Sequence, residues 1–147
     1  ESEELGYIEK IIPVLPRDTL NLAGRLNLQQ AACLLSRAAI YVGPDTAVTH
    51  IAAALGVPTV ALYGPSNPVK WGPWPKSHCE DRNPWKRLGT QRVGNVVLLQ
   101  GPGACVPCLL EGCDRHIASF SDCLQELKSE KVIAAMQTLL QQNTISA

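Results

Sequence analysis

The stretch "GPDTAVTHIAAALGVPTVALYGP", residues 43–65, decides the fold that we predict for this 147-residue chain. It passes from Gly-Pro-Asp-Thr into an alanine-rich segment, residues 46–55, and then reaches Gly56, a residue suited to the left-handed position after a helix. The apolar run "TVALY", residues 59–63, follows and ends in Gly-Pro. We therefore expect a helix over 46–55 and a buried strand over 59–63.

The segments on either side continue this alternation of helices and strands. Asn27 and Gln30 form a capping-box pattern, which predicts a helix over about 28–37. "AAIYV", residues 38–42, and "NVVLLQ", residues 95–100, are short apolar runs that predict two further strands. Since the predicted strands contain few polar residues, we expect an α/β fold with a Rossmann-like parallel sheet and helices on both faces.

The ends of the chain predict two more helices. Residues 2–12 have helical apolar spacing, which Pro13 stops, and Ser129 begins a last segment with one apolar face. Between the first two helices, "TLNLAG", residues 19–24, predicts a short strand or an extended link. We expect one domain over 1–147, in which residues 101–147 hold a cysteine cluster and the terminal helix.

A long segment rich in proline and tryptophan, residues 64–92, has no hydrophobic periodicity and predicts an irregular loop. It contains Trp71, Trp74 and Trp85, which are all the tryptophans of the chain. Aromatic rings of this kind either stack on the faces of sugars or cover the hydrophobic core. The sequence leaves both roles open.

The overall composition excludes some classes of function. Thirteen basic and thirteen acidic residues cancel, so we expect no nucleic-acid partner. No apolar run approaches the roughly 20 residues that span a bilayer, and the acidic start "ESEEL" is unlike a signal peptide. We therefore expect a cytoplasmic protein, and the absence of an initial methionine suggests a fragment of a longer chain.

The junction between the strand before Gly43 and the following helix is the strongest candidate binding site. Ligands of open α/β sheets gather where strands end and helices begin. If Asp45 or Thr46 caps the helix, the N–H groups of about 46–48 are free to bind a phosphate, and the Asp45 carboxylate is free to accept hydrogen bonds from sugar hydroxyls. His50 lies one turn further on. The alternative is a simple helix cap and a histidine satisfied by its neighbours.

The segment "LAGRLNLQQAACLLSRAAIYVGPDTAVTHIAAALGVPTVALYGPSNP" resembles the donor-binding half of the bacterial lipopolysaccharide heptosyltransferases, glycosyltransferase family 9. That family has a Leu-x-Gly lead-in, then a strand, Asp-(Ser/Thr)-Gly-x-x-His, an alanine-rich helix, and a strand that ends in Gly-Pro. The resemblance spans about residues 19–75. It implies a truncated C-terminal half of a GT-B fold, and transfer of heptose from ADP-heptose to the lipopolysaccharide core.

The resemblance also implies roles for individual residues in donor binding. Asp45 would bind the sugar hydroxyls, the backbone at Thr46 and Ala47 would hold the diphosphate, His50 would flank either group, and Leu26 would pack on the adenine. Ala47 stands where the family usually has glycine, and its methyl group would crowd a phosphate.

The resemblance places the acceptor site and the general base in a preceding domain, which we expect this chain to lack. We therefore expect no catalytic residue here and no required cofactor, and an inverting reaction in the intact enzyme. The acceptor would be lipopolysaccharide or another glycan, and the intact enzyme would associate peripherally with the inner membrane face. With strands missing, an exposed sheet edge would allow self-association of the fragment.

Four cysteines, Cys105, Cys108, Cys113 and Cys123, lie within a short segment. Four thiolates suit a structural zinc ion or an iron–sulfur cluster, and His116 would substitute for one sulfur. The alternative is reduced or partly oxidised thiols, since free cysteine is a common buried residue. If the metal holds the fold and the helix terminus is only a cap, the chain would instead be a noncatalytic, cysteine-rich binding module.

Overall fold

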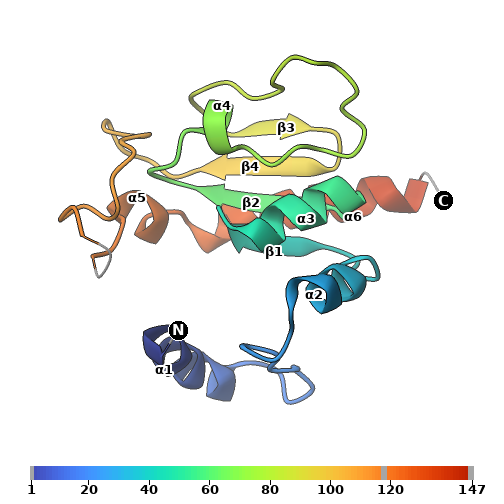
Figure 1. Cartoon of the computed structure of the whole chain (residues 1–147), viewed down its shortest axis with the longest axis vertical. Helices are drawn as coiled ribbons and strands as arrows, with labels where there is room; N and C mark the ends of the chain where they lie inside the picture. Colours follow the sequence, from blue (N-terminus) through green and yellow to red (C-terminus); the bar gives the residue numbers. More distant parts are fainter. Residues whose placement is uncertain (1, 117–118, 146–147) are drawn as a thin grey trace.

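A four-stranded sheet in the order β1-β2-β4-β3 forms the centre of the computed structural model, which describes residues 2–116 and 119–145 (Figure 1). The strands are β1 (Tyr41–Pro44), β2 (Thr59–Tyr63), β3 (Gln91–Val93) and β4 (Val96–Gln100). β1, β2 and β4 run parallel, and β3 pairs antiparallel with β4 at one edge. The predicted α/β fold with a mainly parallel sheet is confirmed.

Helices cover both faces of the sheet, α3 (Ala47–Leu55) in front and α6 (Ser129–Ile145) behind in the view of Figure 1. The strand residues alternate between two cores. Ala61 and Tyr63 of β2 belong to the buried cluster that includes Ala53 of α3. Val60 of β2 belongs to the other cluster, which includes Leu139 of α6. Covering on both faces explains why β2 is apolar at every position but one.

The remaining helices are short or lie away from the sheet. They are α1 (Ser2–Ile11), the 3-10 helix η1 (Ile12–Val14), α2 (Leu28–Leu35), α4 (Pro68–Trp71) and α5 (Asp122–Gln125). α1 lies apart from the sheet in Figure 1, and its Tyr7 ring meets Phe120 edge-on, with 6.4 Å between ring centroids. The capping box predicted for α2 is present, because Asn27 and Gln30 exchange side-chain to backbone hydrogen bonds.

The end of α3 is fixed by a glycine and by one distant side chain. Gly56 adopts φ +84°, as predicted for the residue after this helix, and its N–H donates to the last turn. The Asn95 amide donates to the carbonyls of Ala53 and Val57 at 3.0 and 2.8 Å. Its Oδ1 accepts the Lys76 N–H at 3.2 Å. Asn95 therefore ties α3 to the turn before β4.

Several predicted boundaries differ from the structure. Residues 19–24 contain a turn and no strand, and the first strand is β1 at 41–44 instead of 38–42. The segment 64–92, predicted to be irregular, contains α4 and the first residues of β3. β3 forms because its residues pair with β4, a contact that a local pattern does not reveal.

The tryptophans of this segment differ in burial, and stacking on a sugar stays a prediction for the exposed ones. Trp85 is buried in the core beside Val96 and Leu98, and its Nε1–H donates to the Pro73 carbonyl. Trp71 and Trp74 are about half exposed. In the described residues, no helix is long and apolar enough to cross a bilayer.

Candidate functional site

The carboxyl ends of the parallel strands meet at one edge of the sheet, and Asp45 follows β1 there. A pocket of about 260 Å³ opens beside Asp45. Its wall comes from three segments: the end of β1, the turn and short helix after β2, and the loop after β4. The lining residues are Asp45, Pro65, Ser66, Trp71, Leu109, Leu110 and Glu111.

The amino end of α3 lies next to this pocket and has unused backbone donors. Thr46 occupies the N-cap position with extended backbone angles, but neither its side chain nor that of Asp45 caps the helix. The side-chain cap considered at the sequence level is therefore wrong. In residues 2–116 and 119–145 the N–H groups of Thr46, Ala47 and Val48 have no hydrogen-bond acceptor. Because Thr46 and Ala47 are exposed, a ligand is free to reach these donors.

The turn between β1 and α3 is held by a buried threonine. The Thr49 hydroxyl donates to the Pro44 carbonyl at 2.5 Å, and its oxygen lies 3.0 Å from the Tyr41 hydroxyl. The Thr46 hydroxyl lies further away, 3.5 Å from the same oxygen. These bonds fix the direction in which the chain enters α3 and leave the N–H groups of its first turn unused.

Asp45 is held between two side chains that also lie at this edge. The Tyr63 hydroxyl, at the end of β2, donates to Asp45 Oδ1 at 3.1 Å. His50 Nε2 lies 3.5 Å from the same oxygen, which makes an ion pair when the imidazole is protonated. The Asp45 side chain nevertheless keeps 23% of its surface exposed and the His50 side chain 40%. Both side chains are therefore partly accessible, and Asp45 also lines the pocket.

Tyr63 was not predicted as a site residue. It is 1% exposed, and burial raises the pKa of its hydroxyl well above the usual value. The Asp45 carboxylate raises this pKa further, through its negative charge and through the hydrogen bond. The hydroxyl therefore stays protonated and acts as a donor. A second acceptor, the Trp71 carbonyl, lies 2.5 Å away, so one hydroxyl contacts two walls of the pocket.

Leu26, predicted to pack on a nucleotide base, lies in the segment before α2 with 37% of its surface exposed. It does not line the pocket beside Asp45. The structure thus brings Asp45, Thr46, Ala47 and His50 together at one helix end and leaves the role of Leu26 a prediction.

The four clustered cysteines line a second pocket, of about 230 Å³, between the loop after β4 and α5. Cys123 is buried, and burial raises the pKa of its thiol, opposed by the backbone hydrogen bond from Leu124 and reinforced by the other three sulfurs. The Asp122 N–H donates to Cys113 Sγ at 3.4 Å. In the described part of the chain, however, no three Cys, His, Asp or Glu side chains are grouped to hold a metal ion. The zinc or iron–sulfur site stays a prediction.

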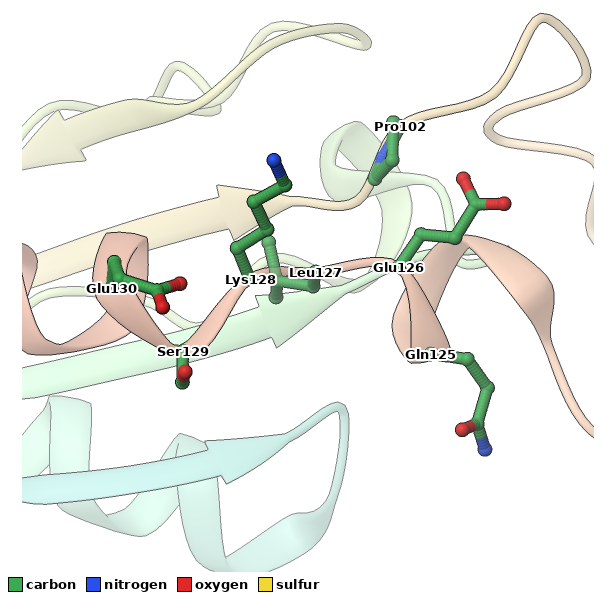
Figure 2. Close-up of a pocket in the computed structure, with 7 residues that line it drawn as sticks. All are labelled: Pro102, Gln125, Glu126, Leu127, Lys128, Ser129 and Glu130. Atoms are coloured by element: carbon green, nitrogen blue, oxygen red, sulfur yellow. The ribbon is translucent and has the colours of Figure 1, made fainter.

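A third, shallow hollow of about 680 Å³ lies where α5 meets α6 (Figure 2). Its residues are Pro102 and the run 125–130. Figure 2 shows the side chains of Glu126, Lys128 and Glu130 spread apart, with Gln125 directed away from them. No residue of this hollow was predicted to bind a ligand, and its polar groups do not converge on one point.

Comparison with known proteins shows which family the chain belongs to. Residues 1–93 match the sequence model of glycosyltransferase family 9, described as heptosyltransferase. The chain belongs to glycosyltransferase family 9. This family 9 chain is 35% identical over 71 residues to the lipopolysaccharide core heptosyltransferase OpsX of Haemophilus influenzae, a match that covers 48% of the chain and 20% of that protein.

Two other relatives of the family 9 chain match over longer segments. Lipopolysaccharide heptosyltransferase 1 of Pseudomonas aeruginosa is 33% identical over 107 residues, which are 73% of the chain and 25% of that enzyme. The solved structure of Escherichia coli ADP-heptose lipopolysaccharide heptosyltransferase II superposes with a TM-score of 0.64 and 25% identity, over 92% of the chain and 33% of the enzyme. The chain thus spans a fifth to a third of the length of these relatives. The family match gives no support to the alternative of a noncatalytic cysteine-rich module.

Proposed function

We propose that this family 9 chain is the donor-binding part of an inverting heptosyltransferase, which transfers heptose from ADP-heptose to the lipopolysaccharide core. One observation carries the proposal. At the start of α3, backbone donors that have no acceptor among the described residues lie directly beside a partly exposed carboxylate, and a pocket opens next to that carboxylate. A nucleotide sugar has matching groups, because its diphosphate is an acceptor and its sugar hydroxyls are donors.

The backbone N–H groups and the carboxylate bind different parts of the nucleotide sugar in this proposal. The N–H groups of Thr46, Ala47 and Val48, together with the positive end of the α3 dipole, favour the diphosphate. The Asp45 carboxylate repels phosphate and accepts from hydroxyls, so it faces the sugar. His50 lies near both groups and neutralises part of the charge when it is protonated. During transfer the same amides stabilise the charge that builds on the leaving diphosphate.

The acceptor and the general base belong, in this proposal, to a part of the enzyme outside these 147 residues. The chain matches only a third of the Escherichia coli heptosyltransferase II, which supports this division. We propose that the intact enzyme works in the cytoplasm, at the inner face of the membrane, where a lipopolysaccharide acceptor would be reached. Leu26 is proposed to contact the adenine.

Calorimetric titration of the chain with ADP-heptose, UDP-glucose and ADP tests the proposal. We expect ADP-heptose to bind, and Asp45→Ala to weaken it by roughly ten- to a hundredfold, the effect of losing hydrogen bonds to a charged group. Asp81→Ala, a change in an exposed loop, serves as the matched control and should leave binding unchanged. A wild-type chain that binds neither ADP-heptose nor ADP would refute the proposal.

A further inference from the structure

We infer that Trp71 and Glu111, on the far wall of the pocket beside Asp45, determine which donor sugar is accepted. The inference rests on the proposed donor-binding function. It assigns the sugar to one pocket, gives Trp71 one of the two roles that the sequence left open, and adds Glu111, which the sequence did not single out. The side chains that line the pocket include those of Asp45, Ser66, Trp71 and Glu111.

The size of the pocket matches one sugar. Its volume of about 260 Å³ lies just below the roughly 300 Å³ at which pockets for small molecules begin. A whole nucleotide sugar is too large for this space. Since the free N–H groups of α3 lie outside it on the exposed helix end, the diphosphate remains there and only the attached sugar enters the pocket.

The charges of the lining select against phosphate and in favour of hydroxyls. Asp45 and Glu111 contribute two carboxylates, and none of the lining residues is lysine or arginine. An anion in this space would meet two negative charges at close range. Carboxylate oxygens and the Ser66 hydroxyl instead offer acceptors to a ligand rich in O–H groups. The lining therefore fits a neutral polyol.

The apolar part of the lining suits the C–H surface of a sugar ring. Trp71 is 49% exposed, and Leu109 and Leu110 lie beside it in the lining. The Lys70 ammonium lies over the Trp71 ring, 4.9 Å from its centroid, which covers part of the indole. The rest of the ring borders the pocket. An aromatic ring beside hydrogen-bonding groups is the usual way to bind a ligand with both apolar and polar surface.

The wall that contains Glu111 is anchored to the wall after β2. The Leu109 N–H donates to the Pro65 carbonyl at 2.9 Å. Leu109 has φ +65°, a left-handed conformation that is uncommon for a residue other than glycine and that is found preferentially at ligand sites. Tyr63 anchors the Trp71 side through its bond to the Trp71 carbonyl. Hydrogen bonds therefore anchor both walls of the pocket.

The ratio of ADP-heptose affinity to ADP affinity tests the inference, because ADP has no sugar to place in the pocket. Calorimetry would give this ratio for the wild-type chain and for Trp71→Ala and Glu111→Ala. Each substitution should lower the ratio by roughly five- to tenfold and leave the ADP affinity unchanged. Trp74→Ala and Glu80→Ala, which change an exposed tryptophan and an exposed glutamate outside the pocket, should retain the wild-type ratio.

The possible failures are distinguishable. A wild-type chain that binds neither ligand refutes the proposed function itself. A wild-type chain that prefers ADP-heptose, with Trp71→Ala and Glu111→Ala keeping that preference, overturns the inference alone. Equal loss of both affinities in the two variants also overturns it, since the residues would then act on the fold or on the diphosphate site. Thermal unfolding of each variant identifies which of these two causes applies.

Discussion

The Tyr63 hydroxyl donates to Asp45 Oδ1 across 3.1 Å, so the last residue of a buried strand holds the carboxylate at the start of α3. The two residues belong to neighbouring parallel strand ends, and the bond joins them directly. Because the same hydroxyl also contacts the Trp71 carbonyl, the position of Asp45 depends on the segment after β2. The site is thus built on the sheet, which holds its groups more precisely than a loop would.

The raised pKa of Tyr63 predicts a loss of stability at alkaline pH. Its folded pKa lies above the value of about 10 for an unfolded tyrosine, so above that pH the folded state holds more protons than the unfolded state. The free energy of unfolding is then fully retained below about pH 10 and falls as the pH rises further. Denaturant titrations between about pH 8 and 11 should show that the free energy of unfolding declines less steeply with pH for Tyr63→Phe than for wild type. Tyr7→Phe, at an exposed tyrosine, should follow the wild-type curve, and parallel curves for all three proteins would contradict the prediction.

Asn95→Ala should destabilise the fold without changing any residue of the candidate site beside Asp45. The substitution removes the side chain that contacts Ala53, Val57 and Lys76, and it leaves their backbone groups without these bonds. We expect a loss of about 1–3 kcal/mol in the free energy of unfolding, measured with urea. Asn21→Ala, which removes one exposed hydrogen bond to Ala23, is the matched control and should cost well under 1 kcal/mol. Equal losses in both variants would show that Asn95 has no special role.

Gly43→Ala should disturb the turn that leads into α3. A Cβ atom at Gly43 would overlap the ring and hydroxyl of Tyr41, which lies on the same face of β1. Since the Tyr41 hydroxyl contacts Thr49, displacing the ring also weakens the β1–α3 turn. The expected cost is about 1–3 kcal/mol, the range for overpacking, measured by thermal or urea unfolding. Gly6→Ala in α1, where a Cβ meets nothing within 4 Å, should be neutral or slightly stabilising. An undiminished stability for Gly43→Ala would contradict the prediction.

Cys123 should be the slowest of the clustered cysteines to react with iodoacetamide. It is buried and its thiol pKa is raised, so both access and the thiolate fraction are low. The exposed cysteines should label first when peptides are followed by mass spectrometry near pH 8; they are Cys33, Cys79, Cys105 and Cys113. Labelling of Cys123 at the rate of Cys33 in the folded chain would contradict the burial of Cys123. In urea the difference should disappear.

The elements with strong local patterns were predicted correctly. α2 has its capping box, and α3 begins within one residue of the predicted start and ends at Gly56, because these signals lie inside the segments themselves. The strand predicted at 38–42 begins three residues and ends two residues before β1. The alanines before Tyr41 are apolar, as strand residues are, but they do not belong to the strand. β3 has three residues and depends on pairing with β4, so no local signal could identify it.

The candidate site was predicted in part for the same reason. Asp45 and His50 lie in one motif, and spacing alone brings them to one helix end. Tyr63 belongs to an apolar run, and only the parallel register carries its hydroxyl to a carboxylate 18 residues earlier. Glu111 reaches the pocket because the loop after β4 folds back on the turn after β2, held by Leu109 and Pro65. A sequence pattern does not describe such long-range contacts.

β1 forms one border of the sheet in the described structure, and its last residue affects what can pair there. The Tyr41 N–H donates to the Pro58 carbonyl and so points into the sheet. Because main-chain groups alternate in direction along a strand, those of Val42 and Pro44 point away from the sheet. Proline has no N–H, which leaves Val42 as the single main-chain donor that the four residues of this rim offer to an incoming chain. Growth of the sheet by pairing with identical copies along this rim is therefore disfavoured by Pro44, which also begins the turn into α3.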